Sequence, residues 1–164
     1  MSATVDVLHE GGDWPQSFDI SAAHAVSAAL AGVGLNPSLF SVSILACDDG
    51  RIAQLNEDFR QKGTPTNVLS WPSDDRAAQI DGEMPAAPDL PMDAELGDIA
   101  ISFDTCAREA AEAGKLFTDH VSHLIVHGTL HLLGFDHIRD ADAALMEGLE
   151  VEILGKLDIP NPYS

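Results

Sequence analysis

The order of apolar and polar positions along the chain predicts four strands. Segments that alternate in polarity or are rich in Val and Ile cover residues 3–8, 39–46, 68–71 and 96–102. Because the third and fourth segments are neighbours in sequence on either side of one connecting loop, we expect them to form an antiparallel hairpin pair.

Helical patterns fill most of the remaining chain. They cover residues 18–33, 48–59, 103–115, 118–133 and 140–156. Asp19 or Ser21 is the expected N-cap of the first of these helices, and Gly32 or Gly34 its expected end. Strands mixed with helices in this way predict an α/β or α+β domain.

Residues 73–95 interrupt the pattern with an acidic, proline-rich segment. It contains seven acidic residues, three prolines and one basic residue, Arg76, so its charge is −6. This composition offers few apolar side chains to offset the entropy that is lost when a segment becomes ordered. We therefore expect a mobile surface loop that is dispensable for folding, within a single domain spanning residues 1–164.

Composition narrows the class of protein. The 164 residues are 45% hydrophobic and 21% charged, which excludes a collagen, a fully disordered chain and a disulfide scaffold. No stretch is apolar enough to span a membrane, and the acidic N-terminus does not resemble a signal peptide. The two cysteines, Cys47 and Cys106, are expected to be reduced and buried, and the chain to be cytoplasmic.

A net charge of −19 argues against non-specific binding to a polyanion, because phosphate contacts depend on Lys and Arg.

Histidines supply the candidate chemistry. On a helix over 118–133, the side chains of His120, His123, His127 and His131 form one stripe. The narrower signal is HGTLHLLGFDH, residues 127–137, in which two histidines four positions apart precede a glycine turn and a third histidine. This is the spacing of the metzincin zinc helix, and three neutral imidazoles leave a fourth metal position open for water. The sequence therefore predicts a zincin-like metal helix with His127, His131 and His137 as the ligands of one zinc ion.

One departure from the metzincin pattern affects the expected reaction. Metzincins carry a glutamate general base directly after the first histidine, whereas this chain has Gly128. Glycine inside a helix is destabilising by roughly 1 kcal/mol relative to alanine, which suggests a close approach of substrate or backbone at this position. A zinc peptidase is therefore disfavoured.

Three motifs in order resemble the YbeY endoribonuclease family. They are the histidine motif, the pair LNEDFRQK (55–62) and TPTNVLS (64–70), and LGDI (96–99). The similarity extends over about residues 40–72 and 95–155, with Trp71 where the family more often has Phe and Phe135 where it often has Tyr. The loop at 73–95 is longer than the family pattern, and the N-terminal third is only loosely similar.

The resemblance implies a fold and a function. The fold would be one mixed sheet packed on helices, with the metal held by the three histidines. The activity would be zinc-dependent, single-strand-specific cleavage of RNA phosphodiesters, in maturation of the 3′ end of small-subunit ribosomal RNA and in ribosome quality control. Single-stranded ribosomal RNA would be the substrate, and ribosomal proteins are candidate partners. Arg60 would be the catalytic phosphate clamp, since a guanidinium can bind a phosphodiester in a bidentate fork.

Several alternatives stay open from the sequence. Arg60 is alternatively a surface residue paired with Glu57 or Asp58, and Lys62 is expected to be a solvated charge. Asp98 and Asp136 either orient a histidine or have only a local structural role, and Thr66 and Asn67 either orient substrate or form a turn. His123 is expected to pack or to support a ligand, and His120 to be exposed. The alternative functions are a zinc hydrolase of a peptide or amide and a non-catalytic, zinc-containing ribosome-associated factor.

Overall fold

A mixed four-stranded sheet is the base of the molecule in the computed structural model, which describes residues 2–163. The strands are β1 (Thr4–Glu10), β2 (Ser41–Cys47), β3 (Val68–Pro72) and β4 (Glu95–Ser102), in the order β1-β2-β4-β3. β1, β2 and β4 run parallel, whereas β3 pairs antiparallel with β4, from Val68 opposite Ile101 to Pro72 opposite Gly97. The predicted α+β class, mixed sheet and hairpin pair are confirmed.

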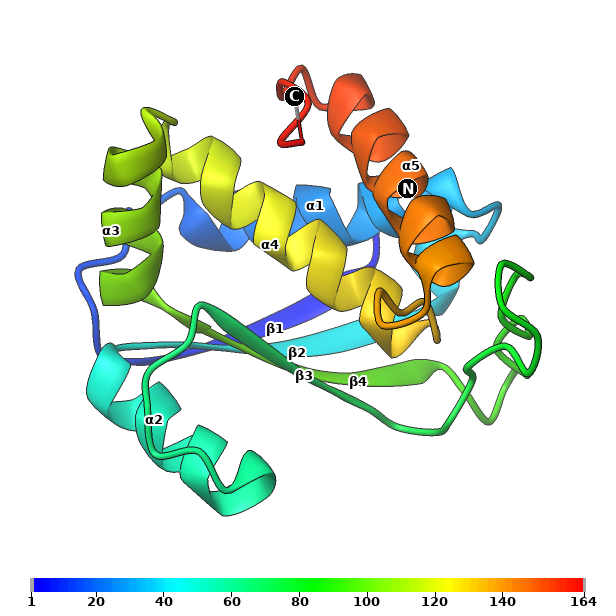
Figure 1. Ribbon diagram of the computed structural model, residues 1–164, viewed down its shortest axis with the longest axis horizontal. Helices are drawn as coiled ribbons and strands as arrows, with labels where there is room; N and C mark the ends of the chain where they lie inside the picture. The colour runs from blue at the N-terminus through cyan, green and yellow to red at the C-terminus, as the bar shows by residue number, and fades with distance from the viewer. Residues whose placement is uncertain (1, 164) are drawn as a thin grey trace.

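The helices cover the two faces of the sheet unequally. They are α1 (Phe18–Gly32), α2 (Asp49–Arg60), α3 (Phe103–Ala113), α4 (Phe117–Leu132) and α5 (Asp140–Lys156), with a short 3₁₀ turn, η1 (Pro37–Leu39). Helices α1, α4 and α5 lie on one side of the sheet, and α2 lies on the other (Figure 1). Helix α4 runs across the sheet and also contacts α1, α3 and α5, so its side chains are fixed from several directions.

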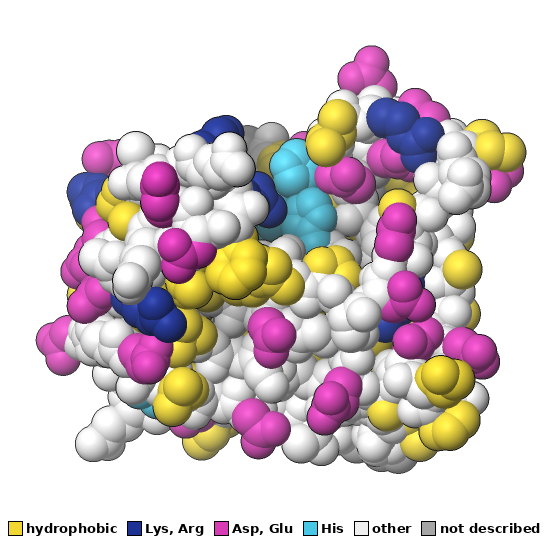
Figure 2. All heavy atoms as spheres, turned by 90° about the horizontal axis from the view of Figure 1, so that it is seen from below, with side chains coloured by type: hydrophobic (Ala, Val, Ile, Leu, Met, Phe, Trp, Pro, Cys, Tyr) yellow, Lys and Arg dark blue, Asp and Glu magenta, His cyan; other side chains and the backbone are white. Residues whose placement is uncertain are grey.

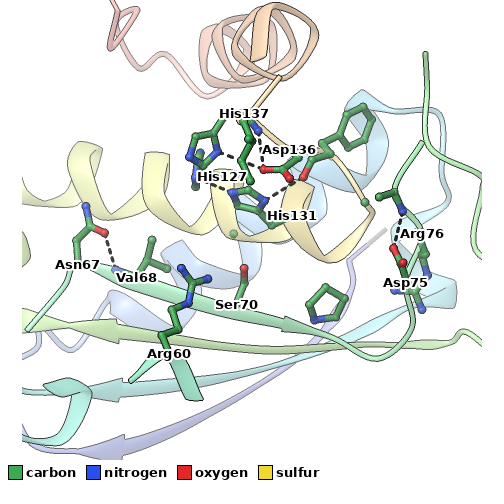
Figure 3. Close-up of a pocket in the computed structure, with 16 residues that line it drawn as sticks. Arg60, Asn67, Val68, Ser70, Asp75, Arg76, His127, His131, Asp136 and His137 are labelled. Carbon is green, nitrogen blue, oxygen red and sulfur yellow. Dashed lines mark hydrogen bonds and ion pairs between the residues drawn. The ribbon is translucent and has the colours of Figure 1, made fainter. Parts of the chain in front are cut away.

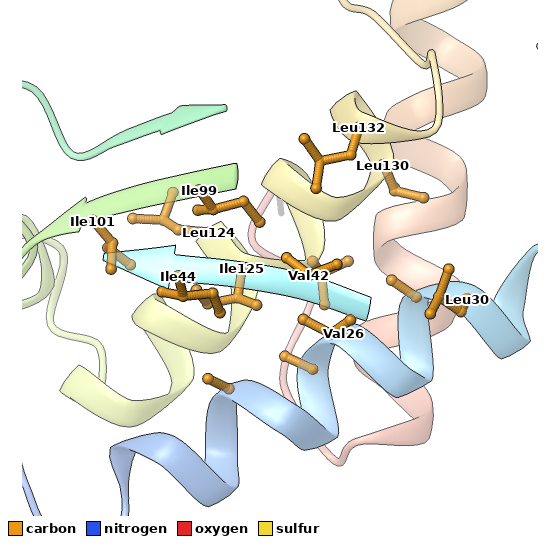
Figure 4. Packing of buried hydrophobic residues seen from close by; sticks show 14 of the residues in the cluster. Val26, Leu30, Val42, Ile44, Ile99, Ile101, Leu124, Ile125, Leu130 and Leu132 are labelled. Carbon is orange, nitrogen blue, oxygen red and sulfur yellow. The ribbon is translucent and has the colours of Figure 1, made fainter. Parts of the chain in front are cut away.

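The core fills the space between the sheet and the covering helices. Val26 and Leu30 of α1 and Ile125 of α4 meet the inward-facing residues of β2 and β4, as Figure 4 shows. All three side chains are fully buried. At roughly 1.5–3 kcal/mol for each buried side chain of this size, the contacts hold α4 firmly against the sheet.

Some predicted boundaries differ from the structure. Helix α1 begins at Phe18 after Ser17, and neither Asp19 nor Ser21 caps it because both already lie inside the helix. Asp19 instead accepts a hydrogen bond from His9 at 2.7 Å. The predicted strand at 39–46 begins later, at Ser41, because the preceding residues form η1.

Both cysteines lie in the interior, as the sequence predicts. Cys47 and Cys106 are both buried and free. Burial, assisted by the neighbouring Asp48 carboxylate, raises the pKa of Cys47 to about 12, so this thiol stays protonated. Within residues 2–163, no helix is both long enough and apolar enough to cross a membrane.

The acidic segment 73–95 is mostly exposed, but it is anchored by its one basic residue. Arg76 is buried, and its guanidinium donates to the carbonyl oxygen of Leu132 at 2.8 Å and to Ser73 Oγ at 2.8 Å. Asp93, from the far end of the segment, lies 3.3 Å from the same group. At Arg76 the segment does not lie on the surface as predicted, because the carbonyl groups at the end of α4 need donors that the helix itself cannot supply. That the segment is dispensable for folding stays a prediction.

Replacing Arg76 should therefore destabilise the protein. We expect Arg76→Ala to lower the free energy of unfolding by about 2–4 kcal/mol, since it leaves buried carbonyl oxygens and a partly buried Asp93 without their partner. Urea unfolding of the purified variant measures the change. Met92→Ala, at an exposed position in the same segment, is the control and should stay within about 0.5 kcal/mol of wild type. An Arg76→Ala variant as stable as this control would restore the view that the segment is dispensable.

Candidate metal centre and active site

Helix α4 and the turn after it bring the three predicted histidines together. His127 and His131 lie one turn apart on the same side of α4, with their Nε2 atoms 3.0 Å apart. His137 follows the helix, and each of the three rings offers a nitrogen within 4.8 Å of the others (Figure 3). The i, i+4 spacing sets the first pair, and the return of the chain after α4 brings in the third.

Gly134 makes this return possible. Its φ of +103° is a conformation that residues with a side chain rarely adopt. A Cβ atom at this position would also lie 2.5 Å from the carbonyl oxygen of Arg76. The glycine thus ends α4, admits the acidic segment against the helix end and directs the chain towards His137.

Hydrogen bonds to the outer ring nitrogens orient the first two histidines. His127 Nδ1 lies 2.5 Å from Glu150 Oε1, and His131 Nδ1 lies 2.9 Å from the carbonyl oxygen of Phe135. A carboxylate and a carbonyl only accept, so each ring in its neutral form carries its hydrogen on Nδ1 and presents a lone pair at Nε2. Two lone pairs 3.0 Å apart repel each other, and a cation between them would relieve this repulsion.

The protonation of the site suits a metal. Burial, together with the neighbouring His127 and His137, lowers the pKa of His131 to about 4, so its ring is neutral at physiological pH. Burial alone would raise the pKa of Glu150, but hydrogen bonds from His123, His127 and Tyr163 outweigh it and lower the pKa to about 2. A neutral ring backed by a main-chain carbonyl, as at His131, and a ring backed by an ionised carboxylate, as at His127, are both common among zinc-binding histidines.

The geometry of the three histidines fits a zinc ion. Ligand nitrogens about 2.0–2.1 Å from a tetrahedral zinc lie about 3.3 Å apart, close to the 3.0 Å between the Nε2 atoms of His127 and His131. Three histidine ligands leave one tetrahedral position towards the pocket. That number of ligands is typical of a catalytic zinc and not of a closed structural one.

Arg60 faces the same pocket. It is the last residue of α2, and Gln61, in the left-handed conformation, ends the helix directly after it. The pocket has a volume of about 580 Å³ and is lined by Arg60, Ser70 and Pro72 on one side and by the three histidines on the other (Figure 3). Neither Glu57 nor Asp58 forms an ion pair with Arg60, whose side chain has no carboxylate partner among residues 2–163. The guanidinium is therefore free to bind a ligand in the pocket.

The other predicted residues separate into those near the pocket and those outside it. Asn67 lines the pocket, but its amide group is occupied, since it donates to Glu109 and accepts from the main chain of Val68. Asp136 also lines the pocket and accepts from the main-chain N–H of His137 at 2.7 Å. Lys62 is exposed and lies outside the pocket lining.

Asp98 does not orient a ligand histidine. It is exposed, and it lines a groove on the α2 side of the sheet, together with Phe59 and Trp71. The side chain of the next residue, Ile99, lies against Gly128 of α4, so Asp98 points to the opposite face because side chains alternate along a strand. Of the two roles considered for Asp98, a direct one at the histidines is wrong.

His120 is not exposed as predicted. Its side chain is only 12% exposed, and Nε2 lies 2.9 Å from Glu109 Oε1. His123, one turn further along α4, lies 3.2 Å from Glu150 Oε2. It contacts the carboxylate behind His127 and is not a member of the cluster of His127, His131 and His137. Of the four histidines in the stripe, His120 therefore contacts Glu109 and His123 contacts Glu150. His127 and His131 belong to the three-histidine cluster.

Gly128 has a packing role. An added Cβ atom would lie 3.1 Å from Ile99 Cδ1, so a larger side chain at this position would press on the sheet. The side-chain neighbour is Ile99 of the core and not a backbone segment, while Gly128 itself also lines the pocket, so a close approach of substrate stays a prediction. A glutamate at this position would have to displace the Ile99 side chain by a few tenths of an ångström, and the glycine of this chain supplies no general base there.

Glu150 is the functional residue that the sequence analysis missed. It lies on α5, and its side chain is fully buried behind His127. The signal was present, since Glu150 falls at helical spacing between the buried residues Met146, Ile153 and Leu154. A charged residue on an apolar stripe needs a partner, and here the partners come from another helix.

The fold and the site define an α+β protein with a three-histidine cluster of the type that binds a catalytic metal. The chain belongs to the YbeY family, because the family model described as Endoribonuclease YbeY matches residues 13–158. The resemblance seen in the three motifs is confirmed.

Individual relatives agree over nearly the whole chain. A protein from Dinoroseobacter shibae named Endoribonuclease YbeY is 60% identical, with 98% of this chain and 91% of the relative covered. A protein of the same name from Jannaschia sp. is 56% identical, with coverages of 97% and 99%. The solution structure of TM1509 from Thermotoga maritima has the same fold, with a TM-score of 0.57 at 18% identity and coverages of 94% and 92%.

Proposed function

We propose that this chain is a zinc-dependent endoribonuclease that cleaves single-stranded RNA. The observation that carries the proposal is the meeting of the three-histidine cluster and the unpaired Arg60 in one pocket. The relatives from Dinoroseobacter shibae and Jannaschia sp. are both named endoribonucleases, which supports RNA as the substrate. The cellular role that we propose is maturation of the 3′ end of small-subunit ribosomal RNA and ribosome quality control, with ribosomal proteins as candidate partners.

The roles of the residues follow from their chemistry. His127, His131 and His137 would hold one zinc ion, which when bound polarises a phosphoryl oxygen or lowers the pKa of a bound water to about 7. Arg60 would hold a non-bridging oxygen pair of the phosphodiester in its planar fork and balance the charge that builds up at phosphorus. Glu150 and the carbonyl of Phe135 keep two of the histidines in the required orientation.

The negative charge of the protein is compatible with an RNA substrate at this site. The net charge is −19, and acidic side chains are scattered over the face shown in Figure 2. On the same face, histidines lie in a hollow with a basic side chain beside them. Neutral ligands around a divalent ion, together with Arg60, would give a locally positive site, while the acidic surroundings would disfavour non-specific RNA binding.

The alternative functions are less well supported. A peptide hydrolase of the metzincin type would need a general base directly after His127, where this chain has Gly128 packed against Ile99. A non-catalytic protein with a structural zinc would be expected to surround the ion with four ligands, whereas this cluster provides three and opens into a pocket.

A nuclease assay with metal removal tests the proposal. The zinc-loaded protein should cleave a labelled single-stranded RNA, and a chelator should lower the rate at least about 100-fold, because several kcal/mol of transition-state stabilisation come from the ion. Adding zinc back should restore cleavage, and the same RNA in duplex form should resist it. Cleavage that persists fully in the metal-free protein would contradict the zinc-dependent proposal, and hydrolysis of a peptide but not of RNA would favour the first alternative.

A further inference from the structure

A buried carboxylate connects the histidine cluster to the C-terminal end of the chain. The side chain of Glu150 is completely buried in α5. It accepts hydrogen bonds from His127 Nδ1 at 2.5 Å, from His123 Nε2 at 3.2 Å and from the hydroxyl of Tyr163. A buried carboxylate without such partners would be strongly destabilising, so these three donors are what allow a charge in this place.

His123, His127 and Glu150 offer ligand atoms within 4.8 Å of one another, as a second metal site would. The separations do not support it. Two ligand atoms of one tetrahedral zinc lie about 3.3 Å apart, whereas His127 Nδ1 and Glu150 Oε1 are 2.5 Å apart. That distance is typical of a short charge-assisted hydrogen bond.

The three metal-type histidines are supported in different ways. Nδ1 of His131 is held by a main-chain carbonyl, whereas Nδ1 of His137 lies 4.0 Å from Asp136 Oδ1 and has no hydrogen-bond partner among residues 2–163. His127 is therefore the one member of the cluster that a buried side chain orients. The orienting Glu150 is itself held by Tyr163, the only tyrosine of the chain, whose ring is about half exposed and packs edge-on against His123.

We infer that Glu150 is a positioning residue of the metal site, which keeps the hydrogen of His127 on Nδ1 and its Nε2 lone pair on the metal, and that Tyr163 fixes Glu150 in this role. The inference rests on the proposed zinc site. It makes metal affinity depend on a contact from the C-terminal segment, 36 residues after His127 in the sequence. An outer carboxylate of this type typically changes metal affinity by 10- to 100-fold.

The test compares Glu150→Gln and Tyr163→Phe with Glu152→Gln, a control on the exposed side of α5. Competition with a chelator measures zinc affinity, nitrogen NMR of the metal-free protein shows which ring nitrogen of His127 carries hydrogen, and thermal unfolding reports the fold. We expect Glu150→Gln to bind zinc about 10- to 100-fold more weakly, Tyr163→Phe to show a smaller loss, and the control to match wild type. Wild-type His127 should carry its hydrogen on Nδ1, and Glu150→Gln should shift this preference.

Other results would distinguish a failure of the inference about Glu150 from a failure of the proposed zinc site. Wild-type zinc affinity in a folded Glu150→Gln variant, with an unchanged His127 ring, would overturn the inference and leave the proposed function intact. A wild-type protein that takes no zinc at the three histidines would overturn the proposed function itself. If Glu150→Gln does not fold, a wild-type His127 with its hydrogen on Nε2, or an unaffected Tyr163→Phe variant, would overturn the inference. A second zinc equivalent lost on His123→Ala would instead indicate a second metal site.

Discussion

Alanine at His127, His131 or His137 is expected to remove the bound zinc and to lower RNA cleavage by about 10³-fold. The three rings are the only side chains that offer the cluster its convergent nitrogens within residues 2–163, so no neighbour can replace a lost ligand. The predicted loss corresponds to several kcal/mol of transition-state stabilisation that the ion supplies. Metal analysis after mild dialysis and cleavage of a single-stranded RNA measure the two effects.

His24→Ala is the matched control for these variants. His24 is exposed on α1, away from the pocket, and its replacement should change neither metal content nor cleavage. If one of the three variants keeps its zinc, the residue concerned is not a ligand. Loss of metal with cleavage unchanged would separate the zinc from the reaction and favour a non-catalytic role for the ion.

Replacing Arg60 should impair the reaction without affecting the metal. We expect Arg60→Ala to lower cleavage by about 10²- to 10³-fold, the usual effect of removing one group that stabilises charge in a transition state. Zinc content and thermal stability should stay near wild type, because the Arg60 side chain is exposed and forms no ion pair with another residue of 2–163. Arg60→Lys should restore only part of the rate, since an ammonium group provides a point charge and not a planar fork.

The adjacent basic residue provides the comparison for Arg60. Lys62 is exposed and lies outside the pocket lining, so Lys62→Ala should have a small effect that decreases as salt is added. Equal losses for the two variants would indicate that general electrostatic attraction, and not a phosphate clamp, explains Arg60. Normal cleavage by Arg60→Ala would exclude a role in the reaction.

Local patterns predicted most elements and the centre of the site. The helix at 140–156 has the expected bounds, and the hairpin pair β3–β4 lies where alternation placed it. The motif around His127 and His131 was informative because a helix places residues four positions apart on one face, whatever the rest of the fold does. Boundaries were less reliable, as at Asp19 and Leu39, because capping and 3₁₀ turns depend on neighbouring chain as well as on residue type.

Tertiary structure decided the contacts between segments that are distant in sequence. Glu150 reaches His127 only because α5 packs on α4, and Arg76 is buried only because the acidic segment passes over the end of α4. Composition identified the acidic segment as exposed, but it could not show which single side chain would satisfy the helix end.

The sequence by itself determined the identity and spacing of the three histidines, the glycine turn between them and the family to which the chain belongs. Only the tertiary structure placed Arg60 across the pocket from them, turned Asp98 to the other face of the sheet and put Glu150 behind His127. The physical reason is the distance along the chain over which each kind of geometry acts. Helix and turn geometry fixes side chains within a few residues of one another, whereas the packing of α4 between the sheet and α5 sets the distances across the rest of the site.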